Sequence, residues 1–292
     1  MQGLKIITTL LICLTLSSCR TDEPTKELPT TIVGISIDSL VRRVAIPSLA
    51  MDKIYNANII LPENYFLDST LQSYPVVYLL HGYSGNYAHW YEKAPIIASL
   101  ASKYDMIIVT PEGGYASWYL DSPIDSSSQF FTYISREVPG YIDEHFRTYT
   151  DGRYRGITGF SMGGHGALSI ALKLPNWFGV VGSMSGAVDV RSIREDYEID
   201  KLLGEYEADS LLWAKHSVVV MSSEPTPKTP RILIDCGVDD IVIEMNRLLH
   251  QTMLDSKIPH TYIERPGEHT WLYWEDAIEF QLKYFDKVFK EG

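Results

Sequence analysis

Short apolar runs that alternate with longer amphipathic stretches restrict the possible folds of this chain more than any other feature. The runs cover residues 75–80, 106–109, 154–158, 180–184, 232–235 and 260–264. Each is short and nearly continuous, as is typical of strands buried on both faces of a parallel sheet. The stretches between them predict helices over residues 88–103, 129–145, 164–174, 242–254 and 273–289. This alternation predicts an α/β fold, in which helices cover both faces of a mostly parallel sheet.

The residues before this pattern have a different period. Apolar and polar residues alternate over 32–37, 41–46 and 54–61, with turn residues between them, which predicts antiparallel strands at the N-terminal edge. The chain has 292 residues, of which 45% are hydrophobic and 21% charged, and this composition excludes a disordered chain. We expect one domain over residues 31–292, with the irregular stretch 190–230 as an insertion near the sheet rim.

The first residues have the pattern of an export signal. Lys5 precedes an apolar run over 6–16, which is too short to cross a hydrocarbon core of about 30 Å. The following Leu-Ser-Ser-Cys is similar to the lipobox of bacterial lipoproteins. This similarity implies a signal peptide over 1–18, a diacylglycerol on the sulfur of Cys19 and a flexible tether over 19–30. We therefore expect a lipid-anchored protein of the bacterial cell envelope, either periplasmic or on the cell surface.

Charge and cysteine usage exclude several classes of partner. Twenty-five basic and 37 acidic residues give a net charge of −12, and nothing in the sequence suggests the basic face that nucleic acid requires. The three cysteines, at positions 13, 19 and 236, cannot form a disulfide framework and do not have zinc-ligand spacing. The sequence also contains neither a P-loop nor a dinucleotide-binding motif. We expect neither a metal ion nor a cofactor.

A G-x-S-x-G motif occupies residues 159–163, where the sequence reads Gly-Phe-Ser-Met-Gly. It follows the apolar run 154–158 and opens the predicted helix 164–174, which is the setting of a nucleophile elbow. So tight a turn leaves no room for side chains two residues on either side of Ser161. It also places the serine hydroxyl at a helix N-terminus, where backbone N–H groups favour negative charge. The motif predicts Ser161 as a nucleophile.

A nucleophilic serine needs a base, and an imidazole is the usual one. Of the eight histidines, His269 alone lies in a loop directly after the last predicted strand, where this topology places the base. The other histidines are expected to be structural, exposed or part of loop architecture: His81, His89, His145, His165, His216, His250 and His260.

The third member of such a triad is a carboxylate after the penultimate strand, because the expected chain order is serine, acid, histidine. The predicted strand 232–235 leads into Cys-Gly-Val-Asp-Asp at 236–240. Asp235 is still within the strand, so the residues themselves leave a choice between Asp239 and Asp240.

Five motifs spread over residues 44–285 resemble one family. They are LHGYSG at 80–85, SWYLDS at 117–122, GFSMGG at 159–164, CGVDD at 236–240 and GEHTW at 267–271. Together they resemble the esterase D-like family, which includes S-formylglutathione hydrolases, tributyrin-type esterases, and acetylxylan and feruloyl esterases. The resemblance implies the α/β-hydrolase fold and chemistry without a cofactor.

The resemblance also implies roles for individual residues. The acid of the family is the Asp of a Gly-x-x-Asp turn, which favours Asp240 here, with Asp239 as the alternative. The oxyanion hole would use the backbone N–H of Met162 and a second N–H from the loop after residue 80, that of Tyr83 in preference to Gly82.

Aromatic residues near these loops predict the character of the pocket. Trp118 and Trp271 are the best candidates to line it, because each lies beside a predicted catalytic segment. The family resemblance, together with the expected export, implies a serine carboxylesterase that removes short acyl, acetyl or feruloyl groups from carbohydrates. Two alternatives remain open, an acyltransferase to a sugar on the same triad and a catalytically silent carbohydrate-binding module.

Overall fold

The computed structural model describes residues 31–32, 35–36, 40–67, 71–193, 196–223 and 229–291. The predicted signal peptide, Cys19 with its tether, and residues 224–228 of the predicted insertion lie outside the described residues.

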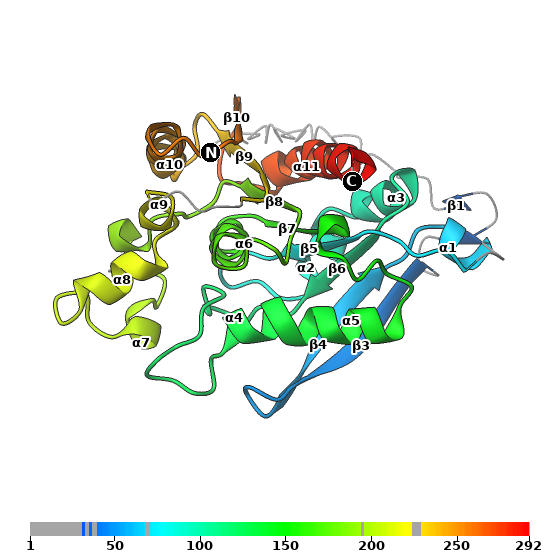
Figure 1. Cartoon of the computed structure of the whole chain (residues 1–292), viewed down its shortest axis with the longest axis horizontal. Coiled ribbons are helices and arrows are strands. Elements are labelled where there is room, and N and C mark those ends of the chain that lie inside the picture. The colour runs from blue at the N-terminus through cyan, green and yellow to red at the C-terminus, as the bar shows by residue number, and fades with distance from the viewer. Residues whose placement is uncertain are drawn as a thin grey trace, which may run out of the picture.

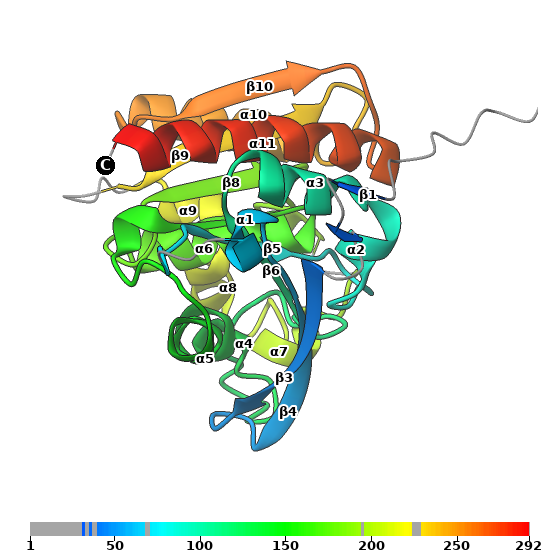
Figure 2. The same ribbon diagram turned by 90° about the vertical axis from the view of Figure 1, so that its right-hand side faces the viewer.

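Eight strands form the central sheet (Figures 1 and 2). They are β3 (Val41–Ser48), β4 (Lys53–Ile60), β5 (Val76–Leu80), β6 (Ile107–Pro111), β7 (Arg155–Gly159), β8 (Val180–Met184), β9 (Arg231–Gly237) and β10 (Thr261–Arg265). Their order is β10-β9-β8-β7-β5-β6-β4-β3. The strands from β5 to β10 pair in parallel, whereas β4 pairs antiparallel with β6 and β3 antiparallel with β4. The predicted fold, a mostly parallel α/β-hydrolase sheet with antiparallel strands at its N-terminal edge, is confirmed.

The central strands are apolar throughout because both faces of the sheet are covered. In β5, Val76, Tyr78 and Leu80 belong to one hydrophobic cluster, whereas Val77 and Leu79 belong to a second cluster on the opposite face. All five are buried. Successive side chains of a strand point to opposite faces, so a continuous apolar run supplies both clusters.

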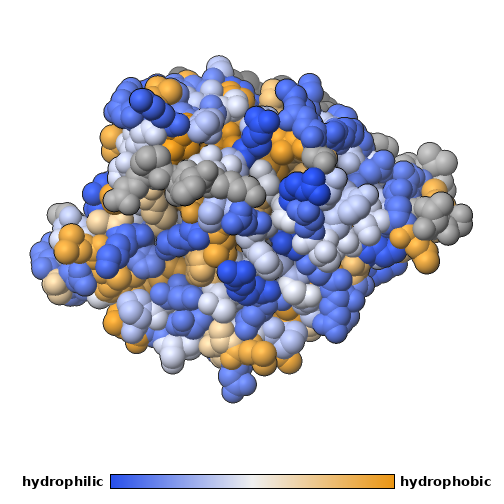
Figure 3. All heavy atoms as spheres, in the orientation of Figure 1, coloured by the Kyte–Doolittle hydropathy of each residue, from blue (hydrophilic) through white to orange (hydrophobic). Residues whose placement is uncertain are grey.

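Helices complete the two clusters. The first is covered by α5 (Val138–His145), α6 (Met162–Lys173) and α10 (Ile243–Asp255), and the second by α2 (His89–Lys93), α3 (Ile96–Lys103) and α11 (Trp271–Glu291). On the side of the molecule seen in Figure 3, hydrophilic residues predominate and hydrophobic residues occur in small groups between them. Among the described residues, no helix is both long enough and apolar enough to cross a membrane.

Three elements differ from the sequence-based expectations. The single helix expected over 88–103 is wrong, because Pro95 separates α2 from α3: proline has no N–H and disfavours a helical residue before it. The helix expected over 129–145 contains a π-helical turn, Tyr133–Glu137, directly before α5, which has Pro139 in its first turn. The single strand expected over 32–37 is also wrong, since β1 (Thr31–Ile32) and β2 (Ile35–Ser36) pair antiparallel with each other.

The stretch expected to be irregular, 190–230, is partly helical. It contains the 3₁₀-helix Val190–Ile193, followed by α7 (Asp200–Leu203), α8 (Ser210–His216) and α9 (Val218–Met221). Trp213 of α8 is fully buried in the first hydrophobic cluster, and α9 packs against α6 and α10. These helices therefore form a cap attached to the main core.

Candidate active site

The predicted site residues meet at one edge of the sheet. Ser161 follows β7, Asp240 follows β9 and His269 follows β10. The carboxyl ends of parallel strands lie at the same edge, so three residues far apart in the chain come into contact there.

The backbone of Ser161 is strained, with φ 54° and ψ −120°. Glycines on either side make this turn possible. A Cβ on Gly159 would lie 2.7 Å from the Leu80 carbonyl oxygen, and one on Gly163 would lie 2.6 Å from the His81 carbonyl oxygen. Real Cβ atoms do not approach backbone oxygen that closely, so the turn and the end of β5 fit together only around glycine.

Three side chains form a continuous hydrogen-bonded chain. The Ser161 hydroxyl lies 3.0 Å from Nε2 of His269. Nδ1 of the same ring lies 2.8 Å from Oδ1 of Asp240 and 3.1 Å from its Oδ2. A carboxylate only accepts hydrogen bonds, so Nδ1 carries the proton and Nε2 is free to accept one from the serine.

Asp240 is buried and remains ionised. Burial alone would raise the pKa of its carboxyl group, but the hydrogen bond and charge of His269 and the backbone N–H of Val242 outweigh it and lower that pKa. Val242 N–H donates to Oδ1 at 2.9 Å. Asp239 is exposed, and Asp235 is fully buried in an ion pair with Arg265, 3.1 Å away. Of the candidate carboxylates, the structure thus brings Asp240 to His269.

The backbone N–H groups predicted to form the oxyanion hole are free of other acceptors among the described residues. Met162 is the first residue of α6, so its N–H has no acceptor within the helix. In the loop after β5, Ser84 N–H donates to Tyr115 and Gly85 N–H to Gly82, whereas the N–H groups of Gly82 and Tyr83 have no acceptor among the described residues. Both predicted donors are thus available, and Gly82 stays an alternative to Tyr83.

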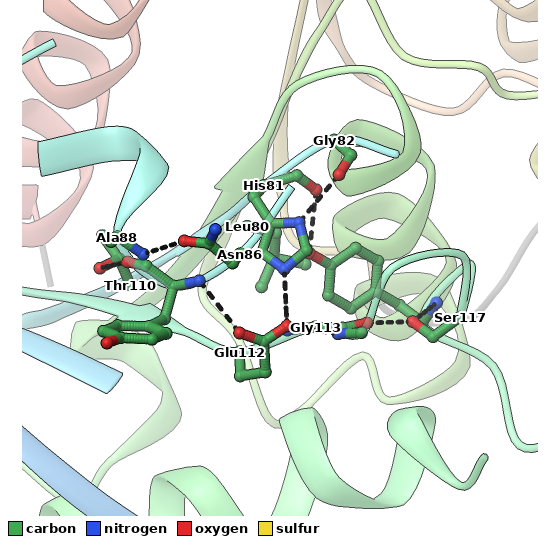
Figure 4. A network of polar contacts seen from close by, with 12 residues as sticks. Leu80, His81, Gly82, Asn86, Ala88, Thr110, Glu112, Gly113 and Ser117 are labelled. Atoms are coloured by element: carbon green, nitrogen blue, oxygen red, sulfur yellow. Dashed lines mark hydrogen bonds and ion pairs between the residues drawn. The ribbon is translucent and has the colours of Figure 1, made fainter. Parts of the chain in front are cut away.

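The His81 ring fixes the loop after β5 to the loop after β6 (Figure 4). Its Nε2 accepts from Gly113 N–H at 2.9 Å, and its Nδ1 donates to the Gly82 carbonyl at 2.8 Å. The Tyr119 hydroxyl donates to the His81 carbonyl at 2.9 Å. The interpretation of His81 as loop architecture therefore agrees with its contacts.

Glu112 lies beside the Nε2 edge of the His81 ring and also joins these two loops (Figure 4). Its carboxylate accepts from Gly114 N–H at 3.0 Å and from Tyr87 N–H at 3.3 Å, and lies 3.7 Å from His81 Nε2. Sequence reasoning did not single out Glu112, because nothing in its local pattern distinguishes it from an exposed loop carboxylate.

A cavity of about 580 Å³ opens onto Ser161 and His269. It is mostly aromatic and aliphatic, and none of its lining residues is Asp, Glu, Lys or Arg. Its walls are Tyr83, Ser84, His89, Trp118, Phe160, Ser161, Ala187, Ile193, Tyr197, Ile241, Val242, Met245, His269, Thr270, Trp271 and Trp274.

The predicted lining residues Trp118 and Trp271 both face this cavity. His89, expected to be structural or exposed, is half-buried in the cavity wall. Tyr197 and Met245 were missed because they come from the cap and from α10, and no local pattern marks a residue that reaches the site only through tertiary packing. Among the described residues, no group of three or more His, Cys, Asp or Glu side chains is placed to hold a metal ion.

Comparisons with known proteins agree on one family. The family model described as "Putative esterase" matches residues 48–285. The acetyl esterase of Caldicellulosiruptor saccharolyticus is 28% identical over 233 residues, which are 76% of this chain and 86% of that protein. A solved ferulic acid esterase superposes with a TM-score of 0.73 at 26% identity, over 85% of this chain and 98% of its own.

A third similarity concerns the fold alone. The S-formylglutathione hydrolase from Agrobacterium tumefaciens superposes with a TM-score of 0.75 at 23% identity, over 85% of this chain and 95% of its own. Proteins whose names give different substrates therefore share this architecture, so the fold does not determine the substrate and the residues of the site do.

Proposed function

The chain belongs to this esterase family, whose members act on ester bonds, and we propose that it hydrolyses carboxylic esters with Ser161 as nucleophile, His269 as base and Asp240 as the acid. The observation that carries the proposal is the continuous contact from Asp240 through His269 to Ser161, which ends at the cavity.

The reaction has two balanced halves. Ser161 Oγ attacks the ester carbonyl while its proton passes to Nε2 of His269, and the tetrahedral oxyanion lies against the N–H groups of Met162 and Tyr83. The bond to the alcohol oxygen then breaks, and His269 gives its proton to that oxygen. Water repeats the sequence on the acyl-enzyme, releasing the carboxylic acid and restoring Ser161. Asp240 keeps the proton on Nδ1 and stabilises the imidazolium ion.

We propose an uncharged ester of a carbohydrate, with an acetyl or feruloyl group, as the substrate. An aromatic and aliphatic cavity without ionised carboxylates, ammonium or guanidinium groups suits a neutral acyl group and a neutral alcohol. A glutathione thioester carries carboxylates, which such a cavity does not neutralise. Relatives named acetyl esterase and ferulic acid esterase support this class.

Ser161→Ala is the direct test, because it removes the nucleophile and leaves the fold intact. Hydrolysis of p-nitrophenyl acetate and labelling by a fluorophosphonate probe should both disappear, whereas thermal unfolding should be unchanged. Undiminished turnover would overturn the assignment. If the wild-type chain is not labelled at all, the protein is a silent binding module, and if it forms sugar ester faster than free acid with a sugar present, it is an acyltransferase.

We further propose that the chain is a lipid-anchored envelope protein. The support is the Leu-Ser-Ser-Cys sequence that ends at Cys19. Metabolic labelling with an alkynyl fatty acid in a bacterial host should mark the wild-type chain but not Cys19→Ala, and equal labelling of the two would contradict the proposal.

A further inference from the structure

The cavity wall contains two groups of aromatic rings, one beside His269 and the other beside the cap. In one group, Trp271 contacts Phe160 at 4.7 Å and Trp274 at 5.5 Å between ring centroids, and Trp274 contacts His269 at 4.9 Å. The other group consists of Trp118 and Tyr83, which both contact Tyr197 of the cap, at 6.4 and 5.1 Å. The first group therefore adjoins the base, and the second adjoins the cap.

The reaction mechanism assigns one part of the ester, the alcohol or the acyl group, to each of these two aromatic groups. His269 must give its proton to the oxygen of the departing alcohol, so the alcohol has to lie on the side of His269. The alcohol of the ester is therefore expected against Trp271, and the acyl group toward Trp118 and Tyr197.

His89 lies on the alcohol side. It is the first residue of α2, its ring contacts Trp271 at 6.4 Å between centroids, and it faces the cavity. Among the described residues its ring nitrogens have no hydrogen-bond partner. Burial lowers the pKa of the imidazole. A neutral imidazole offers one donor and one acceptor, which suits a hydroxyl group.

We propose that His89 is a specificity-determining residue that hydrogen-bonds a hydroxyl of the leaving alcohol while a pyranose ring lies against Trp271. The proposal rests on the esterase function proposed above. A pyranose has an apolar face of C–H groups and hydroxyls around its edge, and Trp271 with His89 at its rim offers the complementary apolar face and polar edge. A simple alkyl alcohol has no such hydroxyl and would gain nothing from His89.

The test compares two esters with the same acyl group, acetylated xylo-oligosaccharide and p-nitrophenyl acetate. His89→Phe keeps a ring of similar size but removes both nitrogens. The ratio of kcat/KM for the sugar ester to that for the nitrophenyl ester should fall about tenfold, the loss expected for one buried hydrogen bond. His89→Gln, which retains a donor and an acceptor, should recover most of that ratio. His145→Phe, an exposed histidine on α5, is the matched control and should not change it.

Binding of the sugar alone gives a second readout. Methyl β-xylopyranoside should inhibit hydrolysis of p-nitrophenyl acetate competitively, with an inhibition constant about tenfold higher in His89→Phe. Equal loss on both esters would make His89 structural, and unchanged kcat/KM on both would mean that it does not touch the alcohol. Either result overturns the inference. If the wild-type chain hydrolyses neither ester, the proposed function fails instead.

Discussion

Replacing Asp240 by asparagine tests the geometry of the site most sharply, because the change removes one charge and almost no volume. Oδ1 of Asp240 accepts both from His269 Nδ1, at 2.8 Å, and from Val242 N–H, at 2.9 Å. An asparagine that keeps its oxygen toward Val242 N–H still offers Nδ1 of His269 an acceptor at 2.8 Å, but it places an NH₂ donor where Oδ2 lies, 3.1 Å from the same Nδ1. The variant therefore loses the negative charge that stabilises the imidazolium ion, and its NH₂ group opposes the proton on Nδ1.

The size of the effect follows from burial. The Asp240 side chain is fully buried and that of His269 is 20% exposed, so water screens the pair poorly. Removing one partner of a buried charge pair costs about 3–5 kcal/mol. The pair becomes fully charged only when His269 accepts the serine proton, so this cost falls mainly on the transition state. At about 1.4 kcal/mol per factor of ten, kcat should fall by about 10²–10⁴ while KM changes little.

Asp239→Asn is the matched control, since it makes the same chemical change one residue earlier at an exposed position. Steady-state hydrolysis of p-nitrophenyl acetate should show a loss of under twofold for Asp239→Asn, and thermal unfolding should show that both variants are folded. Comparable losses in the two variants, or a loss below tenfold in Asp240→Asn, would refute the reasoning.

Three other predictions follow from the same contacts. Gly163→Ala should destabilise the protein by about 1–3 kcal/mol in urea unfolding, because the added Cβ would collide with the backbone at the end of β5. Gly140→Ala is the control: a Cβ there has no neighbouring atom within 4 Å, so this variant should be more stable by about 0.5–1 kcal/mol. The glutamine of Glu112→Gln has one carbonyl oxygen for two backbone N–H groups, so the change should cost about 1–3 kcal/mol of stability and lower kcat more than it changes KM. An effect on KM alone would contradict a role of Glu112 in holding the loop after β5. The pKa of fully buried His165 is lowered to about 3 by burial, so the unfolded chain binds its proton first as pH falls below 6.5. Stability should therefore drop by about 2 kcal/mol between pH 7 and 5 on account of this residue, and His165→Asn should flatten that dependence.

The fold was largely predictable because the apolar run of each central strand is itself evidence of burial on both faces. A strand such as β5 needs apolar residues on both faces wherever it pairs, and the sequence shows this without knowledge of its neighbours. The expectation over 88–103 was wrong because helical periodicity outweighed a single residue, Pro95. The break is nevertheless a local effect, because a proline lacks the N–H group and disfavours a helical conformation at the residue before it.

The amino-acid sequence by itself determined the alternation of strands and helices, the strained turn at Ser161 and the chain order of the three site residues. These depend on local periodicity and on which residues tolerate a tight turn. Only the tertiary structure decided that Asp240 rather than Asp239 faces His269, and that His89 and Tyr197 enter the cavity wall. The direction of a loop side chain is set by elements that pack against it from far along the chain, and no local pattern contains that information.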